Sequence, residues 1–217
     1  MATKRAAARI KVEDTYHHGD LKSSLKKTVL HLVREKGPRG FSLNEASRLA
    51  GVTAAAPYRH FEDKDALLAE IACDGCHLMA RELREAAAKV SGVKEQMLEA
   101  GMAYLRFSST HADYFDVIFN AGLDKSKYQE LGRAAGEAFG VILELSHRSE
   151  KTPELASQRA VSAWALVHGF ATLAEDGALS TAFGKKSEFE NLRPILRQFL
   201  NKPYRSIRPE KKQRETK

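Results

Sequence analysis

The chain has 217 residues, a hydrophobic fraction of 43% and a formal net charge of +7. This length holds one or two domains, and the hydrophobic fraction is enough to form a buried core. No apolar stretch approaches the roughly 20 residues of a membrane-spanning helix, and no apolar segment follows the charged N-terminus as in an export signal. We therefore expect a cytoplasmic protein rather than a membrane or exported one.

The positive charge is concentrated toward the two ends of the sequence. Residues 15–65 carry nine basic and six acidic side chains, and residues 202–217 carry seven basic and two acidic ones. Basic side chains neutralise phosphates, which supplies most of the sequence-independent affinity of a protein for DNA. We expect residues 1–16 to form a basic disordered arm that reaches along a duplex or into a minor groove. Residues 202–217 are expected to form a basic, solvated and disordered tail.

Residues 20–36 are predicted to form the first helix. Apolar residues recur at helical spacing after Asp20, which is a candidate N-cap, and Gly37 with the following proline ends the helix. His17 and His18 beside Asp20 resemble a metal cluster, but no further ligand stands at a suitable spacing. We therefore expect no metal site.

The next apolar pattern predicts a short helix that ends abruptly. Leu43, Ala46 and Leu49 recur at spacings of three, which places them on one face of a helix. Gly51 follows, and glycine adopts the left-handed conformation of a helix C-terminus at little steric cost. A second helix can then start in a new direction.

The second helix is expected from Ala54 to about His60, with Thr53 as its N-cap. Pro57 is compatible only with the first turn, because proline lacks the N–H group that a helix interior uses. The exposed positions begin with small alanines and continue with a tyrosine, an arginine and a histidine. Small side chains allow close approach to a DNA major groove, and the larger ones supply donors and ring faces beside it. Lys64 begins the following helix, where a lysine and free amides together hold a phosphate.

These residues form one unbroken pattern over about thirty positions: Phe41-Ser42-Leu43, Ala46, Leu49-Ala50-Gly51-Val52, Tyr58-Arg59-His60-Phe61, Lys64 and Ala66-Leu67-Leu68. The pattern resembles the helix-turn-helix of TetR-type transcriptional regulators. The resemblance implies that Tyr58 and Lys64 touch phosphates and that Ala54, Ala55 and His60 lie in or beside the groove. The alternative is a three-helix core with a surface tyrosine. The predicted DNA contacts are Ser42, Thr53, Ala54, Ala55, Pro57, Tyr58, Arg59, His60 and Lys64.

A long helix is predicted from residue 63 to about residue 90. It contains Cys73-Asp-Gly-Cys76, a spacing that also occurs in redox and zinc motifs. Redox pairs of this type lie where a strand enters a helix, and zinc needs a second pair, so neither context is present. We therefore expect two buried or pocket-lining thiols on one helix face. Gly75, between them, is a position at which the helix is expected to bend.

Five further helices are predicted, near residues 93–109, 111–120, 126–147, 153–176 and 188–200. Aromatic residues recur at helical spacing from Tyr104 to Phe119, a pattern that is typical of a core and that we interpret in part as a pocket lining. The third of these helices carries glycines at 132, 136 and 140, and each costs a helix up to about 1 kcal/mol relative to alanine. Such glycines indicate close helix packing or space for a ligand.

Trp164 and His168 stand four residues apart, and Gly169 follows. The trio resembles the Trp-His-Gly signature of one C-terminal domain type among TetR-like regulators. Two interpretations of His168 stay open: a hydrogen bond to an effector beside the indole, or a core histidine with an internal partner. The predicted effector pocket comprises Cys76, Tyr104, Phe107, Phe119, Trp164 and His168.

The last two predicted helices carry more apolar side chains than one small domain can easily cover. Two such helices from each subunit form a four-helix interface in a dimer, and TetR-like proteins are similar in this respect. A two-fold dimer places two recognition helices about one groove repeat apart, on a palindromic operator. The predicted interface includes Val167, Phe170, Leu192, Leu196 and Phe199.

The sequence therefore predicts an all-α protein, with a three-helix helix-turn-helix domain at residues 17–65 and a helical effector-binding and dimerisation domain at residues 66–201. We expect a repressor that a largely apolar small molecule releases from its operator, with the long helix as the lever and no cofactor. Motifs such as Gly-x-Ser-x-Gly, His-Glu-x-x-His and the Gly-rich phosphate loop are absent, so we expect no catalytic residues. The alternatives are a helical hydrophobe-binding protein and an all-α enzyme, neither with specific DNA binding.

Overall fold

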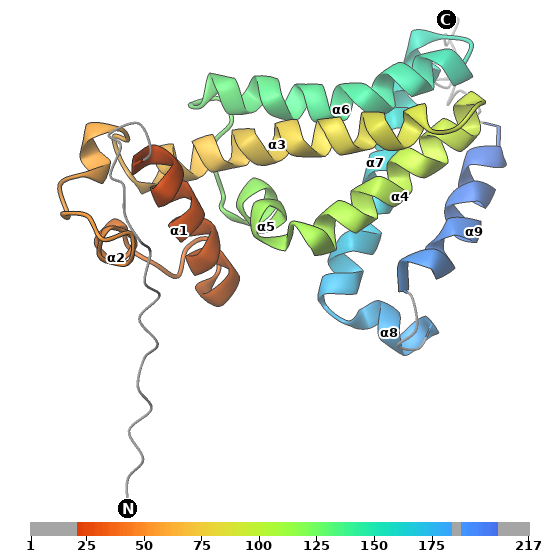
Figure 1. Cartoon of the computed structure of the whole chain (residues 1–217). Coiled ribbons are helices and arrows are strands. Elements are labelled where there is room, and N and C mark those ends of the chain that lie inside the picture. The colour runs from red at the N-terminus through yellow and green to blue at the C-terminus, as the bar shows by residue number, and fades with distance from the viewer. Residues whose placement is uncertain (1–20, 184–187, 204–217) are drawn as a thin grey trace, which may run out of the picture.

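The computed structural model describes residues 21–183 and 188–203, and within these residues all regular structure is helical (Figure 1). The predicted arm at residues 1–16, His17, His18, the candidate cap Asp20 and most of the predicted tail lie outside the described residues. The helices are α1 (Leu21–Lys36), α2 (Leu43–Leu49), α3 (Lys64–Ala88), α4 (Val93–Thr110), α5 (Ala112–Asn120), α6 (Gln129–Ser149), α7 (Pro153–Glu175), α8 (Ala178–Phe183) and α9 (Glu188–Asn201), and a 3₁₀ turn spans Pro57–Arg59.

The prediction of an all-α protein is confirmed. The five helices predicted for the C-terminal part correspond to α4, α5, α6, α7 and α9. Helix α8 was not expected, because its six residues are too few to show a helical period. Among the described helices, none has both the length and the hydropathy that crossing a membrane requires.

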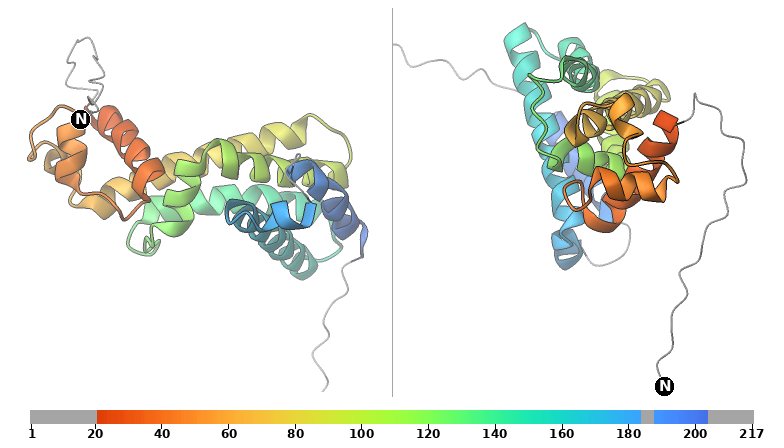
Figure 2. Two further views of the ribbon diagram at one scale, coloured as in Figure 1. Left: turned by 90° about the horizontal axis from the view of Figure 1, so that it is seen from below. Right: turned by 90° about the vertical axis from the view of Figure 1, so that its left-hand side faces the viewer.

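Helix α3 connects the two ends of the molecule. Figure 1 shows it running from the head, formed with α1 and α2, along the length of the C-terminal bundle, and Figure 2 shows the same arrangement from two other directions. In the bundle α3 packs against α4, α5 and α6, while α4 also packs against α7 and α9. A second connection between head and bundle is the contact of α1 with α5.

Glycine ends both helices that precede the recognition segment, as predicted. Gly37 has a φ of 73° and its N–H donates to the Val33 carbonyl at 2.8 Å, which closes α1. Gly51 has a φ of 72°, and the next N–H, that of Val52, donates to the Ser47 carbonyl at 2.9 Å. This bond over five residues is the Schellman pattern, so the chain leaves α2 at a fixed angle.

Leu49 does not lie on the buried face of α2 as predicted. Its side chain is 50% exposed, whereas Leu43, Ala46 and Ser47 are buried. The buried face is thus centred on residues 43, 46 and 47. Successive residues are turned by about 100°, so residue 49 lies roughly 110° from that centre, at the edge of the exposed face. Leu49 therefore adds an apolar side chain to the surface of the head.

Helices α3 and α5 pack closely together at Gly75. A Cβ atom at Gly75 would lie 2.9 Å from Tyr114 Cδ1 and 3.0 Å from Ile118 Cδ1. Helix α3 is unbroken through this residue. The glycine therefore serves close packing of α5 rather than the predicted bend.

We expect Gly75→Ala to lower the free energy of unfolding by about 1 kcal/mol. Overpacking destabilises a protein by about 1–3 kcal/mol. The higher helix propensity of alanine stabilises it by about 1 kcal/mol, which offsets part of that cost. The matched control is Gly136→Ala in α6, where a Cβ meets no atom within 4 Å, so this change should raise stability by up to about 1 kcal/mol. Urea unfolding at one protein concentration measures both. Equal stabilisation by the two changes would contradict the packing role.

Candidate DNA-binding and effector sites

The segment that follows α2 is wound more tightly than predicted. The Ala56 N–H donates to the Thr53 carbonyl at 3.0 Å, and the His60 N–H donates to the Pro57 carbonyl at 2.9 Å. Bonds over three residues are those of a 3₁₀ helix. The expected α-helix from Ala54 to His60, capped by Thr53, is therefore wrong. The reason is Pro57, which stands four residues after Thr53 and has no N–H to donate to its carbonyl.

Most of the predicted DNA contacts in residues 53–60 lie on the surface of the head. The side chain of Tyr58 is 57% exposed. Pro57 is the exception, because it is buried in the head and therefore cannot present its ring to a duplex. The exposed residues among the predicted contacts of this segment are Thr53, Ala54, Ala55, Tyr58, Arg59 and His60.

Ser42, another predicted contact, is exposed at the N-terminus of α2. Its Oγ accepts a hydrogen bond from the Glu45 N–H at 3.2 Å and so caps the helix. The cap uses a lone pair of the hydroxyl and leaves its proton available to a phosphate oxygen. The two uses are compatible.

Lys64 begins α3 as predicted, but its ammonium group is turned into the head. Nζ donates to the Phe41 carbonyl at 2.8 Å and to the Arg39 carbonyl at 3.3 Å, and it lies 4.0 Å from the centroid of the Phe41 ring. Burial lowers the pKa of Lys64, and the charge of Arg39 lowers it further. The Asp63 carboxylate caps α3 by accepting the Ala66 N–H at 2.7 Å. Lys64 thus holds the loop before α2, and its phosphate contact stays a prediction.

A cavity of about 220 Å³ lies between α3, α5, α6 and α7. Three residues of the predicted pocket line it, namely Cys76, Phe119 and Trp164. The lining residues that sequence analysis missed are Met79, Ile118, Lys125, Ala135, Ala138 and Phe139. Ala135, Ala138 and Phe139 lie on α6, the helix whose glycines indicated space for a ligand. Lys125 lies in a loop, and a loop has no helical periodicity from which its position could be predicted.

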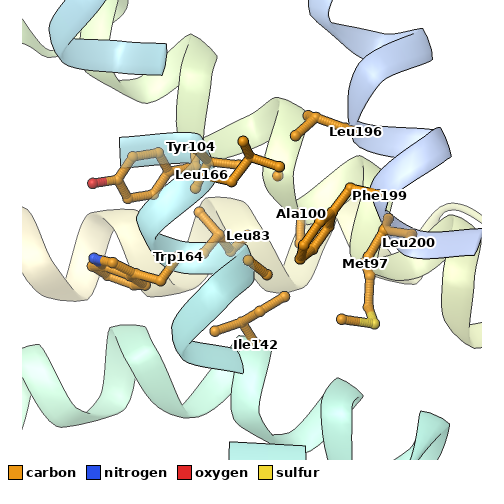
Figure 3. Close-up of a pocket in the computed structure, with 13 residues that line it drawn as sticks. Leu83, Met97, Ala100, Tyr104, Ile142, Trp164, Leu166, Leu196, Phe199 and Leu200 are labelled. Carbon is orange, nitrogen blue, oxygen red and sulfur yellow. The ribbon is translucent and has the colours of Figure 1, made fainter. Parts of the chain in front are cut away.

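A second, smaller cavity of about 30 Å³ lies between α4, α7 and α9. Figure 3 shows Tyr104 and Trp164 toward one side of it and Leu196, Phe199 and Leu200 toward the other. This volume has room for little more than one water molecule. Trp164 lines both cavities, so its indole responds to whatever occupies either one.

The two cysteines are free thiols, Cys73 half-buried and Cys76 buried. Burial raises the pKa of Cys73, and it raises the pKa of Cys76 to about 11. Both thiols are therefore protonated at neutral pH, which makes them poor nucleophiles. In the part of the chain that the structure describes, no group of three or more histidine, cysteine, aspartate or glutamate residues is placed to hold a metal ion.

Two residues of the predicted pocket, Phe107 and His168, line neither cavity. Phe107 is fully buried in the core. His168 Nδ1 forms a hydrogen bond with the Tyr104 hydroxyl at 2.9 Å, and its ring centroid lies 4.6 Å from that of Phe119. This geometry favours the core histidine with an internal partner over the histidine that binds an effector. Burial lowers the pKa of His168, which keeps the imidazole neutral at pH 7.

Acidification is expected to destabilise the protein through His168. Below about pH 6.5 His168 binds a proton in the unfolded chain, whereas its lowered pKa keeps it neutral in the folded chain. The free energy of unfolding therefore decreases as the pH falls through this range. His168→Asn retains an acceptor near the position of Nδ1 for the Tyr104 hydroxyl and does not titrate. Urea unfolding between about pH 7.5 and 5.5 should give this variant a shallower pH dependence than the wild type. Identical slopes would mean that His168 titrates as in the unfolded chain.

Two protein-family models match the chain at the positions of the head and the bundle. The model described as "Bacterial regulatory proteins, tetR family" matches residues 28–71, and the one described as "Tetracyclin repressor-like, C-terminal domain" matches residues 97–192. The chain belongs to the TetR family. Neither description mentions a Trp-His-Gly type, so that finer assignment stays a prediction. No curated protein sequence matches the chain.

Solved structures share the fold of this chain. A protein of unknown function from Rhodococcus sp. RHA1 is 25% identical, with a TM-score of 0.74 over 87% of this chain and 97% of that one. A regulatory protein of the tetR family from Rhodococcus RHA1 is 12% identical, with a TM-score of 0.64 over 83% and 95%. The regulator FadR from Bacillus subtilis, solved in complex with stearoyl-CoA, is 10% identical, with a TM-score of 0.65 over 82% and 96%.

In this TetR-family protein the head is tied to the bundle by an ion pair between α1 and α5. Arg34 Nη2 lies 2.9 Å from Asp113 Oδ2, and the Asp113 side chain is only 3% exposed. Helix α5 also carries Ile118 and Phe119, which line the larger cavity. One short helix therefore touches both the cavity and the head.

Three residues of the predicted dimer interface are already covered within one chain. Val167, Leu192 and Leu196 are buried, which leaves little of their surface for a partner subunit. A Cβ at Gly101 of α4 would lie 3.4 Å from Val167 Cγ1 and 3.6 Å from Leu196 Cδ1. The side chains of α7 and α9 therefore both pack against α4 at this glycine. Phe170 and Phe199 are half-buried. The exposed apolar residues of α7 are instead Val161, at 59%, and Leu173, at 43%.

Proposed function

We propose that this TetR-family protein is a cytoplasmic, ligand-responsive repressor that binds a palindromic operator as a homodimer and is released by a largely apolar small molecule. The observation that carries the proposal is the double contact of α5 with the effector cavity and with the head. An element that contacts both sites can couple them when it has two arrangements and each ligand favours one of them.

The DNA-binding domain in this proposal comprises residues 17–65, and the effector-binding and dimerisation domain comprises residues 66–201. The exposed surface of residues 53–60 enters the major groove, with the alanines close to base edges and Tyr58 and Arg59 beside the phosphates. The tight 3₁₀ turn supports this role, because it holds Tyr58 outward while Pro57 and Phe61 are buried in the head.

Dimerisation in this proposal uses the outer face of α7. Val161 and Leu173 leave apolar side chains exposed there, and Phe170, three residues before Leu173, is half-buried. A two-fold axis along this face pairs the same surface of two subunits and sets two heads on one side of the dimer. Two heads related by a two-fold axis require an operator with the same symmetry.

The effector releases the operator because it binds more tightly to the conformation that does not bind DNA than to the conformation that does. A ligand in the cavity presses on Ile118 and Phe119, and α5 transmits the change to α1 through Asp113 and Arg34. Helix α3, the lever expected from the sequence, lines the same cavity through Cys76 and begins in the head. A coupling free energy of about 1–3 kcal/mol would change operator affinity by about 5-fold to 150-fold.

The test is selection of duplexes from a random pool by the purified full chain at near-physiological salt, with sequencing of the bound DNA. A palindromic consensus, together with a dimer mass by light scattering, is the expected result. Enrichment without a consensus would mean that the basic regions bind DNA only electrostatically. In that case the proposed regulator fails, and a helical protein that binds hydrophobic molecules without specific DNA binding takes its place.

A further inference from the structure

We propose that the effector is a small aromatic carboxylic acid, whose ring occupies the cavity between α3, α5, α6 and α7 and whose carboxylate pairs with Lys125. The inference rests on the proposed function, because it takes this cavity as the effector site. It adds the chemical class of the ligand and the residue that selects the class.

The walls of the cavity favour an aromatic body. Phe119, Phe139 and Trp164 contribute three aromatic rings from three different helices. Aromatic rings attract another ring in offset or edge-to-face arrangements beyond the effect of burial alone. The volume of about 220 Å³ also fits such a body, since an apolar protein cavity of about 150 Å³ accommodates benzene. The remaining space suits a short chain leading from the ring.

Lys125 is the one charged residue that lines the cavity. The other polar groups of the lining are the Cys76 thiol and the Trp164 indole. Burial raises the pKa of Cys76 to about 11, so the thiol carries no charge at neutral pH that could satisfy the lysine. Lys125 therefore supplies the only formal charge among the residues that line this cavity.

The neighbouring charges leave Lys125 available. Asp124 Oδ1 accepts both the N–H and the hydroxyl of Ser126, at 2.8 Å and 2.6 Å. Lys127 Nζ lies 3.6 Å from Asp63 Oδ2. The Lys125 residue is exposed, and its side chain forms no hydrogen bond or ion pair with any residue that the structure describes. A cation at the mouth of an apolar cavity, with no anion of its own, is suited to an anionic ligand.

A glycine fixes the loop in this position. A Cβ at Gly132 of α6 would lie 3.3 Å from the Lys125 carbonyl oxygen, so the loop packs against α6 at a distance that larger residues oppose. The placement of Lys125 beside the cavity is thereby part of the packed structure. It also accounts for one of the three glycines that the sequence places on one face of this helix.

The experiment measures ligand binding by the fluorescence of Trp164, the only tryptophan of the chain, which lines the cavity. The probes are 3-phenylpropionate and its neutral amide, added to the full-length protein. The variants are Lys125→Met, which keeps the length of the side chain and removes the charge, and Lys127→Met as the matched control from the same loop, since Lys127 does not line the cavity.

We expect the acid to bind wild type and Lys127→Met with equal affinity and to bind Lys125→Met about fivefold more weakly, because solvent screens the pair that an exposed lysine forms. The amide should not distinguish the three proteins, and Lys125→Arg should restore binding of the acid. Equal binding of acid and amide by wild type, or no binding of the acid, would overturn the inference.

Failure of the inference and failure of the proposed function give different results. If the acid binds through Lys125 and selection finds no operator, the ligand site is supported and the proposed repressor function is wrong. If an operator is found and the acid neither binds nor releases it, the repressor stands and the ligand class is wrong. Release of the operator by the acid, but not by the amide, would support both.

Discussion

Replacing Tyr58 with alanine will lower the affinity for the selected operator by about tenfold or more and will change the free energy of unfolding by less than about 0.5 kcal/mol. The side chain is 57% exposed, and its hydroxyl bonds to no described residue, so the fold loses little. A hydrogen bond from this hydroxyl to a phosphate is charge-assisted and contributes about 1.5–3 kcal/mol. Because 1.4 kcal/mol corresponds to a factor of ten, the loss is large on the scale of binding. Fluorescence anisotropy and urea unfolding measure the two quantities.

Three further variants make this result specific to the recognition surface. Tyr58→Phe keeps the ring and separates its contribution from that of the hydroxyl. Arg59→Ala should weaken binding and reduce the slope of log affinity against log salt by about one, the value for one lost phosphate contact. Arg81→Ala on α3 is the matched control, because the Arg81 side chain is 65% exposed, and it should change neither the operator affinity nor the salt slope. Wild-type affinity in Tyr58→Ala would remove Tyr58 from the interface.

Lys64 is a less suitable test of the same surface. Its ammonium group holds the carbonyls of Arg39 and Phe41, so an alanine at this position removes internal hydrogen bonds as well as any contact with a phosphate. Loss of operator affinity in such a variant would not distinguish the two causes. The exposed position of Tyr58 avoids this ambiguity.

Arg34→Ala is expected to lower the free energy of unfolding by about 2 kcal/mol. It leaves the Asp113 carboxylate, which is 3% exposed, without its cationic partner. Removing one partner of a fully buried pair costs about 3–5 kcal/mol, and the 63% exposure of the Arg34 side chain reduces this because solvent screens the interaction. Urea unfolding at fixed protein concentration measures the change.

The control for this prediction lies on the same helix. Lys22 pairs with Glu70 at 2.7 Å, but both side chains are well exposed, so Lys22→Ala should cost no more than about 1 kcal/mol. A double-mutant cycle of Arg34→Ala with Asp113→Asn isolates the energy of the pair. An interaction energy near zero would mean that the ion pair does not fasten the head to α5, and the proposed route from cavity to operator would then run through α3 alone.

The local pattern of the sequence determined much of the head. Gly37 and Gly51 end their helices as predicted, because a left-handed residue at a helix C-terminus is a property of a few neighbouring residues. The recognition segment was predicted in position but not in conformation. Pro57 has no N–H group, so it cannot form the α-helical hydrogen bond to the Thr53 carbonyl, and a 3₁₀ turn forms instead. Residue spacing alone does not distinguish a 3₁₀ turn from the first turn of an α-helix.

The sequence by itself therefore determined an all-α chain, the glycine-terminated ends of α1 and α2 and the position of its TetR-family head. Only the tertiary structure decided which apolar faces meet. Val167 and Leu196 looked available for a partner until α4 was found to bury them at Gly101, and His168 acquired an internal partner in Tyr104 from another helix. Lys125 reached the cavity through a loop that has no periodicity to interpret. The physical reason is common to all three: helical periodicity follows from contacts three or four residues apart, whereas burial and cavities follow from contacts between helices distant in the chain.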